Sequence, residues 1–152
     1  MELFVARHGE ASFDAKSDRL RPLTDRGISE TESCLTMVQG GLDAVQQIWV
    51  SDLVRAQQTA LLINKELEVE LVTKTFLRPE SDPQVVLRNL ELNETGSVFI
   101  VAHQPLLGCL VSLLVEGHTY SPHPFCTSEI LQLQSDSCGA GLFSISHQYL
   151  PA

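Results

Sequence analysis

The sequence predicts an α/β fold with three layers, in which helices cover both faces of a mostly parallel sheet and an antiparallel strand is added at one edge. Two observations lead to this prediction. Short apolar runs alternate with helical stretches over most of the chain, and the end of the chain instead carries two strand-like segments separated by a turn. The 152 residues contain no repeat and no long linker, so we expect one domain over residues 1–152.

Three runs are short, apolar and rich in β-branched or aromatic residues, as is typical of buried strands: Glu2–Ala6, Ile48–Val50 and Ser97–Ala102. A fourth strand is expected over Glu68–Thr73. Near the end, Ser128–Gln134 alternates in the manner of a half-buried strand. After a turn rich in Ser and Gly, Leu142–His147 is expected to pair back on it as a hairpin.

Four helices are expected from capping and first-turn residues: one opened by Thr24, one from Ser51 or Asp52 to about Glu66, one from Asp82-Pro83 to Leu92, and one from Pro105 to about Val115.

Composition narrows the class of protein. The mix of 43% hydrophobic and 19% charged residues is ordinary for a globular protein, and no apolar stretch is long enough to cross a bilayer. The N-terminus lacks the pattern of a secretory signal, so we expect a cytoplasmic protein without a membrane partner. A net charge of −9 argues against a nucleic-acid partner.

The 4 cysteines form no CxxC pair, which favours reduced thiols. None is followed six residues later by the arginine that a cysteine-based phosphatase would need, because those positions are Gly40, Val115, Gln132 and Ser144.

The segment Arg7-His8-Gly9-Glu10 directly follows the first predicted strand. The carboxyl ends of strands carry the ligands in open α/β sheets, and a glycine there lets backbone amides approach an anion. A cation, an imidazole and a glycine at this place therefore outline a phosphate site.

Two further strand ends repeat this arrangement. Ser51 and Arg55 share one face where the second strand turns into a helix, so a hydroxyl and a guanidinium can reach the same anion. The strand Ser97–Ala102 ends directly before His103. By contrast, His118 and His123 lie in a Pro-rich loop without a comparable setting. Three strand ends are thus expected to bring Arg7, His8, Arg55 and His103 together.

The chain resembles the histidine phosphatase superfamily, whose hallmarks are an Arg-His-Gly motif after the first strand, a second arginine in a Ser-x-x-x-Arg-Ala-x-x-Thr-Ala segment, and a late histidine. It is most similar to the short bacterial phosphohistidine phosphatases of the SixA type. The residues that carry this similarity extend over most of the chain: Arg7-His8-Gly9-Glu10-Ala11, Ser17-Asp18 with Arg21-Pro22-Leu23-Thr24, Arg55-Ala56 with Gln58-Thr59, and His103-Gln104-Pro105-Leu106. The resemblance implies a phosphoglycerate mutase-like fold without a lid subdomain.

The resemblance also implies a covalent mechanism. His8 attacks phosphorus and carries the phosphoryl group, while Arg7, Arg55 and His103 stabilise charge on the transferring oxygens. Nearby guanidinium groups favour the neutral imidazole that a nucleophile requires. His103 is either a protonated clamp on the phosphate or a neutral donor.

Further residues are candidates for substrate binding: Gly9, Arg21, Ser51 and Gln104. Arg21 either reaches the rim of the pocket or lies on the surface. Glu80 is the candidate general acid, and its alternative is a loop carboxylate that faces solvent. A phosphohistidine can dispense with a strong acid, because the departing imidazole is a far weaker base than an alkoxide.

Only a short segment separates Glu80 from the strand before His103, which leaves no room for a lid. An open pocket favours a phosphohistidine on a folded protein, such as a histidine-phosphotransfer domain, over a small metabolite. Two alternatives remain: a general phosphomonoesterase or mutase with the same His8 chemistry, and a non-catalytic module that binds phosphate. No metal-ligand spacing such as HExxH occurs, so we expect no metal and no cofactor. Oligomeric state is left open, with a monomer favoured.

Overall fold

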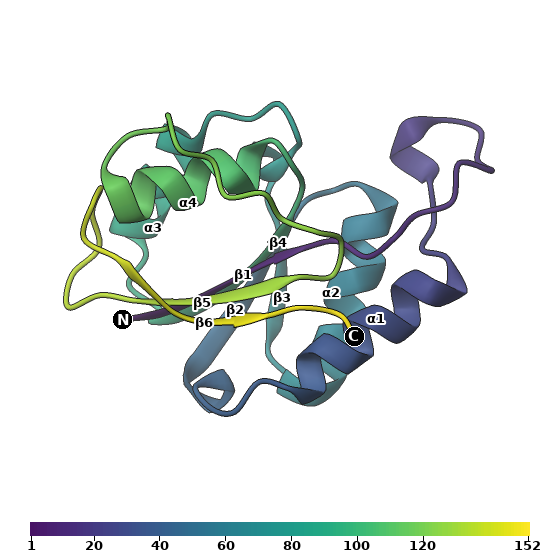
Figure 1. Ribbon diagram of the computed structural model, residues 1–152, viewed down its shortest axis with the longest axis horizontal. Helices are drawn as coiled ribbons and strands as arrows, with labels where there is room; N and C mark the ends of the chain where they lie inside the picture. The colour runs from purple at the N-terminus through teal and green to yellow at the C-terminus, as the bar shows by residue number, and fades with distance from the viewer.

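The computed structural model describes residues 1–152, and its centre is a six-stranded sheet in the order β3-β2-β4-β1-β5-β6 (Figure 1). The strands are β1 (Glu2–Arg7), β2 (Val45–Val50), β3 (Glu70–Thr73), β4 (Ser97–Ala102), β5 (Ile130–Gln134) and β6 (Ser144–Tyr149). The first four pair in parallel, whereas β5 is antiparallel to both β1 and β6. The predicted mixed sheet is confirmed, with the terminal hairpin as its antiparallel addition.

Four helices cover the sheet: α1 (Asp25–Thr36), α2 (Val54–Leu67), α3 (Pro83–Leu92) and α4 (Leu106–Glu116). Helices α1 and α2 lie on one face, and α3 and α4 lie on the other (Figure 1). Three short 3₁₀ helices lie in the connections: η1 (Asp18–Leu20), η2 (Leu42–Ala44) and η3 (Thr75–Leu77). No helix is both long and apolar enough to span a membrane.

The alternation of apolar residues along the central strands produces the three layers. In β1, Leu3 and Val5 pack with the core beneath α3 and α4, while Phe4 and Ala6 pack with the core beneath α1 and α2. Successive side chains of a strand point to opposite faces, so a continuous apolar run fills both cores at once. This is why the central strands read as uninterrupted apolar segments.

Two of the predicted caps are present. The Thr24 hydroxyl accepts a hydrogen bond from the Gly27 amide at 3.0 Å, and the Asp82 side chain accepts from the Gln84 amide at 2.9 Å.

The prediction that Ser51 or Asp52 caps the second helix was wrong. Helix α2 begins after Leu53, which provides no side-chain cap. Both predicted caps bind elsewhere, because Ser51 contacts His103 and the carboxylate of Asp52 binds Arg78 through two oxygens.

Candidate active site

A cavity of about 450 Å³ lies where the carboxyl ends of β1 and β4 meet the start of α2. Its lining residues are Arg7, His8, Glu10, Ala11, Phe13, Asp18, Arg21, Arg55, Pro79, His103, Gln104 and Thr127. The four residues that the sequence assigned to the reaction centre all line this cavity. Since they come from three different elements, the parallel strands are what gather them.

His8 lies just beyond the end of β1 and is 6% exposed. Its Nδ1 is 2.7 Å from the carbonyl oxygen of Gly9, so Nδ1 carries the proton and donates it to that oxygen. Nε2 is then left with a free electron pair. Burial, followed by the charges of Arg55 and Arg7, lowers the pKa of His8 to about 4. The imidazole is therefore neutral near pH 7, as a nucleophile requires.

His103 is buried beside His8, with the two ring centroids 5.0 Å apart. Its Nε2 is 2.7 Å from the Ser51 hydroxyl, which also accepts a hydrogen bond from the Leu53 amide at 3.3 Å. Nε2 is the only acceptor within hydrogen-bond distance of this buried hydroxyl, so the hydroxyl donates to Nε2 and the ring proton lies on Nδ1. Burial and the neighbouring His8 lower the pKa of His103 to about 3, which favours a neutral donor over a protonated clamp.

The two arginines are each held by one backbone carbonyl. Arg7 donates from Nη1 to the Phe125 carbonyl at 2.9 Å, and Arg55 donates from Nη1 to the Asp18 carbonyl at 2.8 Å. Both keep a buried Nε without a partner in the protein, and the third such atom is Nδ1 of His103. Buried donors are almost always paired in proteins. That all three belong to residues lining one cavity indicates an anion-binding site.

Comparison with known proteins agrees with this geometry. A profile of the histidine phosphatase superfamily (branch 1) matches residues 3–79. Phosphohistidine phosphatase SixA of Escherichia coli is 34% identical over 149 residues, which cover 95% of this chain and 91% of that protein. The SixA homolog of Haemophilus influenzae is also 34% identical, over 90% of this chain and 89% of its own length.

The chain belongs to the histidine phosphatase superfamily. A solved structure of the protein histidine phosphatase SixA complexed with tungstate superposes with a TM-score of 0.83 at 30% identity, and the match covers 99% of this chain and 97% of that one. The predicted family and fold are confirmed.

Arg21 lines the cavity, so of its two predicted positions, the pocket rim and the surface, the structure shows the first. Its Nη1 is 3.2 Å from Oδ1 of Asp18, while the other oxygen of Asp18 is 3.2 Å from Nη2 of Arg55. The hydrogen bond from Arg21 lowers the pKa of the Asp18 carboxyl, so Asp18 is ionised near pH 7. Sequence reasoning assigned no role to Asp18. The available signal was its place in the motif that runs from Ser17 to Arg21.

Gly9 is buried, but its amide is not free for a phosphate because it donates to the Thr59 hydroxyl at 3.0 Å. The amide of Gly9 itself is therefore not among the backbone amides that can approach an anion, which corrects the expectation that Gly9 binds substrate. A Cβ at this position would lie 2.8 Å from the Gly27 carbonyl oxygen and 3.0 Å from Oγ1 of Thr31. In this member of the superfamily, Gly9 lets the first loop pack against α1.

Ser51 and Gln104 also differ from the direct substrate contacts expected of them. Ser51 is fully buried and does not line the cavity, and its hydroxyl contacts His103 instead. Gln104 lines the cavity, but its amide donates to the His123 carbonyl at 2.9 Å and accepts from the Gly108 amide at 2.7 Å. Both side chains therefore hold neighbouring parts of the site.

Glu80 is exposed and does not line the cavity that contains His8. It lines a shallower depression beside it, together with Arg19 and Arg78, while the adjacent Pro79 reaches the cavity wall. This placement favours the solvent-facing alternative for Glu80.

A buried carboxylate that the sequence did not reveal holds the loop beside Arg7. Glu129 accepts hydrogen bonds from the Cys126 amide at 3.0 Å and from Gln148 at 3.0 Å, and lies 2.5 Å from Nε2 of His123. These contacts fix the loop whose Phe125 carbonyl receives Arg7. No signal in one sequence distinguishes such a carboxylate from the exposed majority.

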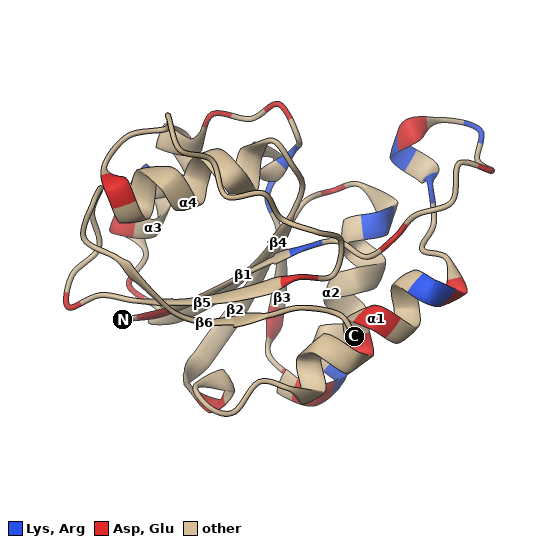
Figure 2. Cartoon of the chain, viewed as in Figure 1, with Lys and Arg blue, Asp and Glu red and all other residues tan.

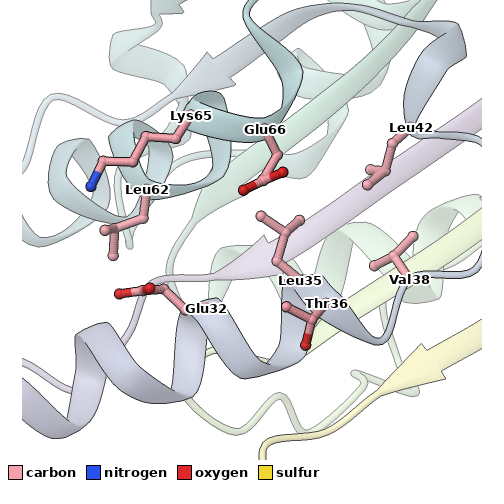
Figure 3. Close-up of a pocket in the computed structure, with 8 residues that line it drawn as sticks. All are labelled: Glu32, Leu35, Thr36, Val38, Leu42, Leu62, Lys65 and Glu66. Atoms are coloured by element: carbon pink, nitrogen blue, oxygen red, sulfur yellow. The ribbon is translucent and has the colours of Figure 1, made fainter.

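A second cavity of about 340 Å³ lies between α1 and α2, with Leu35, Val38 and Leu62 among its lining residues (Figure 3). Its lining includes no histidine or arginine and shares no residue with the cavity that His8 lines. Figure 2 shows Lys and Arg near the starts of α1 and α2 and on the projecting segment before α1. Red segments lie among them, and the cavity is lined by both Arg7, Arg21 and Arg55 and the carboxylates of Glu10 and Asp18.

Proposed function

We propose that this protein is a phosphohistidine phosphatase that passes the phosphoryl group of a protein histidine to His8 and then to water. The observation that carries the proposal is the set of three unpartnered donors, Arg7 Nε, Arg55 Nε and His103 Nδ1, beside a neutral imidazole. The activity named for the SixA relatives supports it. We further propose that residues 1–152 act as one domain.

In the first step, the electron pair on Nε2 of His8 forms a bond to phosphorus, and the phosphorus–nitrogen bond of the substrate breaks. The bonding pair stays on the departing ring, which leaves as neutral imidazole when its other nitrogen carries a proton. The guanidinium groups of Arg7 and Arg55 and the Nδ1–H of His103 stabilise the charge spread over the phosphoryl oxygens.

In the second step, a water oxygen forms a bond to phosphorus and the bond to His8 breaks. The Gly9 carbonyl keeps a proton on Nδ1, so phosphorylated His8 has a cationic ring and leaves as neutral imidazole. The water loses one proton to phosphate or solvent, and His8 returns to its starting state. The contact between His8 and Gly9 thus serves both steps.

The carboxylates around the cavity support a phosphohistidine substrate over a phosphate ester. An alkoxide leaving group needs a general acid. Asp18 is ionised and Glu80 lies outside the cavity. Glu10 lines the cavity, but its carboxylate accepts from the Thr24 hydroxyl at 2.8 Å and pairs with Arg26 at 3.9 Å. Imidazole has a pKa of about 6.5 and leaves without such help. The proposed partner is a phosphorylated histidine-phosphotransfer domain, because no lid subdomain covers the cavity.

A rapid-quench experiment tests the proposal. The protein is mixed with a histidine-phosphotransfer domain carrying ³²P on its histidine, and acid-labile, base-stable label is followed on each chain. We expect transient label on the wild type, none on His8→Ala, and wild-type behaviour from Arg88→Ala, which removes an exposed arginine outside the cavity. Binding of the phosphorylated domain with neither label nor hydrolysis would instead identify a non-catalytic module.

A further inference from the structure

The segment from Ser12 to Pro22, here called the arm, projects from the body between β1 and α1 (Figure 1). Its ends are tied together by the bridge between Ala11 and Leu23 and by the hydrogen bond from the Ser12 amide to the Pro22 carbonyl at 2.8 Å. Its middle is tied to the cavity through Asp18, which binds Arg55. The arm is therefore a closed loop built onto the phosphate site.

Phe13, on the arm, is both highly exposed and part of the cavity lining. It is 86% exposed and at the same time lines the catalytic cavity, so it stands at the mouth. By contrast, the equally exposed Tyr120, at 87%, lines no cavity.

The ring of Phe13 is held in place from one side. Cζ of Arg21 lies 3.9 Å from the ring centroid, in a cation–π contact. Arg21 is itself fixed, since Nε donates to the Ser12 carbonyl at 3.0 Å and Nη2 donates to the Ala11 carbonyl at 3.2 Å. The exposed ring is thus preorganised, which reduces the entropy lost when another surface covers it.

His8 is only 6% exposed, so a phosphoryl group reaches it only through the mouth of the cavity. A phosphohistidine that remains part of a folded protein brings its surrounding surface against that mouth. Free phosphohistidine carries no such surface. Phe13 therefore contacts the two kinds of substrate to different extents.

Resting on the proposed function, we propose that Phe13 is the docking anchor for the protein substrate, and that it packs against apolar side chains flanking the phosphohistidine. Trp, Tyr and Arg are enriched among the residues that dominate binding energy at protein interfaces, and Phe is enriched at interfaces as a whole. Leu20, 48% exposed, is a second exposed apolar side chain on the same arm. The occupant is thus a folded phosphoprotein.

The test compares kcat/KM on two substrates: a histidine-phosphotransfer domain phosphorylated with phosphoramidate, and free phosphohistidine. We expect Phe13→Ala to lower the ratio of the first kcat/KM to the second by about tenfold or more, chiefly through KM for the phosphoprotein. Phe13→Leu keeps an apolar side chain and should recover most of the ratio. Tyr120→Ala removes an equally exposed ring away from the cavity and should leave the ratio unchanged.

If Phe13→Ala and the wild type have the same ratio of kcat/KM for the phosphoprotein to kcat/KM for free phosphohistidine, the docking role is overturned and the proposed function remains intact. A wild-type protein that hydrolyses neither substrate would overturn the proposed function itself, and the docking role with it.

Discussion

The Ser51 hydroxyl lies 2.7 Å from Nε2 of His103, and this contact decides which ring nitrogen of His103 carries the proton. Because the Leu53 amide is a donor, Nε2 is the only acceptor open to the buried hydroxyl, which therefore donates to Nε2. Nδ1 then carries the ring proton as an unpartnered donor. A fully buried serine that does not line the cavity thereby sets the hydrogen-bonding state of His103.

Replacement of Ser51 by Ala should therefore lower kcat more than it raises KM, since the Nδ1–H of His103 is no longer enforced. Loss of one preorganised donor costs on the order of 10² to 10³ in rate, and Ser51→Ala should lose a part of that. Ser112→Ala is the matched control, because Ser112 is also buried but binds the His118 carbonyl away from the cavity. Steady-state kinetics of both variants check this, and their melting temperatures should be equal. Equal kcat values for Ser51→Ala and Ser112→Ala would contradict it.

Arg55 couples the phosphate site to the arm, since it binds both the carbonyl and the carboxylate of Asp18. We expect Arg55→Ala to lower kcat by about 10² to 10³. Arg55→Lys should recover little, because an ammonium cannot reproduce the planar fork. Single-turnover formation of phosphorylated His8 measures the effect, with Arg88→Ala as the control. Full recovery by lysine would show that charge alone matters.

The depressed pKa values of His8 and His103 predict how the protein responds to acid. With folded-state values of about 4 and about 3, both rings stay neutral as the pH falls from 7 to 5. The unfolded chain takes up protons near pH 6.5, so the free energy of unfolding falls as the pH decreases from about 7 toward 4. NMR titration of the imidazole carbons checks this. A midpoint near 6.5 for either ring would contradict it.

Glu80 provides a test of leaving-group chemistry. A general acid typically contributes on the order of 10² to 10⁴ in rate, whereas we expect Glu80→Gln to leave turnover of phosphohistidine within about twofold. Glu94→Gln, which changes another exposed loop carboxylate, is the matched control. A large loss for Glu80→Gln on both phosphohistidine and a phosphate ester would restore Glu80 as the acid.

Gly9 should be intolerant of a side chain for reasons of packing. A Cβ would meet the backbone oxygen of Gly27 at 2.8 Å, and backbone cannot move aside cheaply. We expect Gly9→Ala to lower the free energy of unfolding by about 1 to 3 kcal/mol. At Gly40 a Cβ would meet nothing within 4 Å, so Gly40→Ala should be close to neutral. Chemical denaturation of both variants makes the comparison, and equal midpoints would refute the packing role.

The sequence predicted most of the fold because local signals and tertiary demands agree. Leu3 to Ala6 is apolar throughout since both faces of β1 are buried, and Asp82-Pro83 opens α3 as such pairs usually do. The start of β2 was missed because Gln46 and Gln47 interrupt the apolar run before Ile48. Hydrophobic periodicity does not distinguish polar residues near the end of a strand from a loop.

The site was predictable only as far as parallel strand ends must meet. That rule places His8, Arg55 and His103 together, and it says nothing of what each amide or hydroxyl binds. The hydrogen bond between Ser51 and His103 and the one from the Gly9 amide to Thr59 each join residues more than 40 positions apart in the sequence, and both depend on how side chains pack. Such pairings carry no spacing signal, so sequence reasoning assigned both residues to the substrate.

Glu129 offers the last test, because it holds the loop that positions Arg7 from outside the cavity. Hydrogen bonds from His123, Gln148 and the Cys126 amide lower the pKa of this buried carboxyl against the opposing effect of burial, so it is ionised. Glu129→Gln keeps the shape but removes the charge and one acceptor. Hydrogen bonds to charged groups contribute about 1.5 to 3 kcal/mol, and we expect a loss of stability within that range.

If Glu129 has a purely structural role, Glu129→Gln lowers stability only. If it positions Arg7, the variant also binds phosphate more weakly, because the Phe125 carbonyl no longer holds Arg7 in place. Inorganic phosphate affinity, measured by calorimetry below the unfolding transition, separates the two. Glu2→Gln is the matched control, because Glu2 accepts a side-chain hydrogen bond from Gln132 at the opposite end of β1. Unchanged phosphate affinity in Glu129→Gln would show that this carboxylate contributes to stability alone. A loss of phosphate affinity in Glu129→Gln but not in Glu2→Gln would show that the position of Arg7 depends on it.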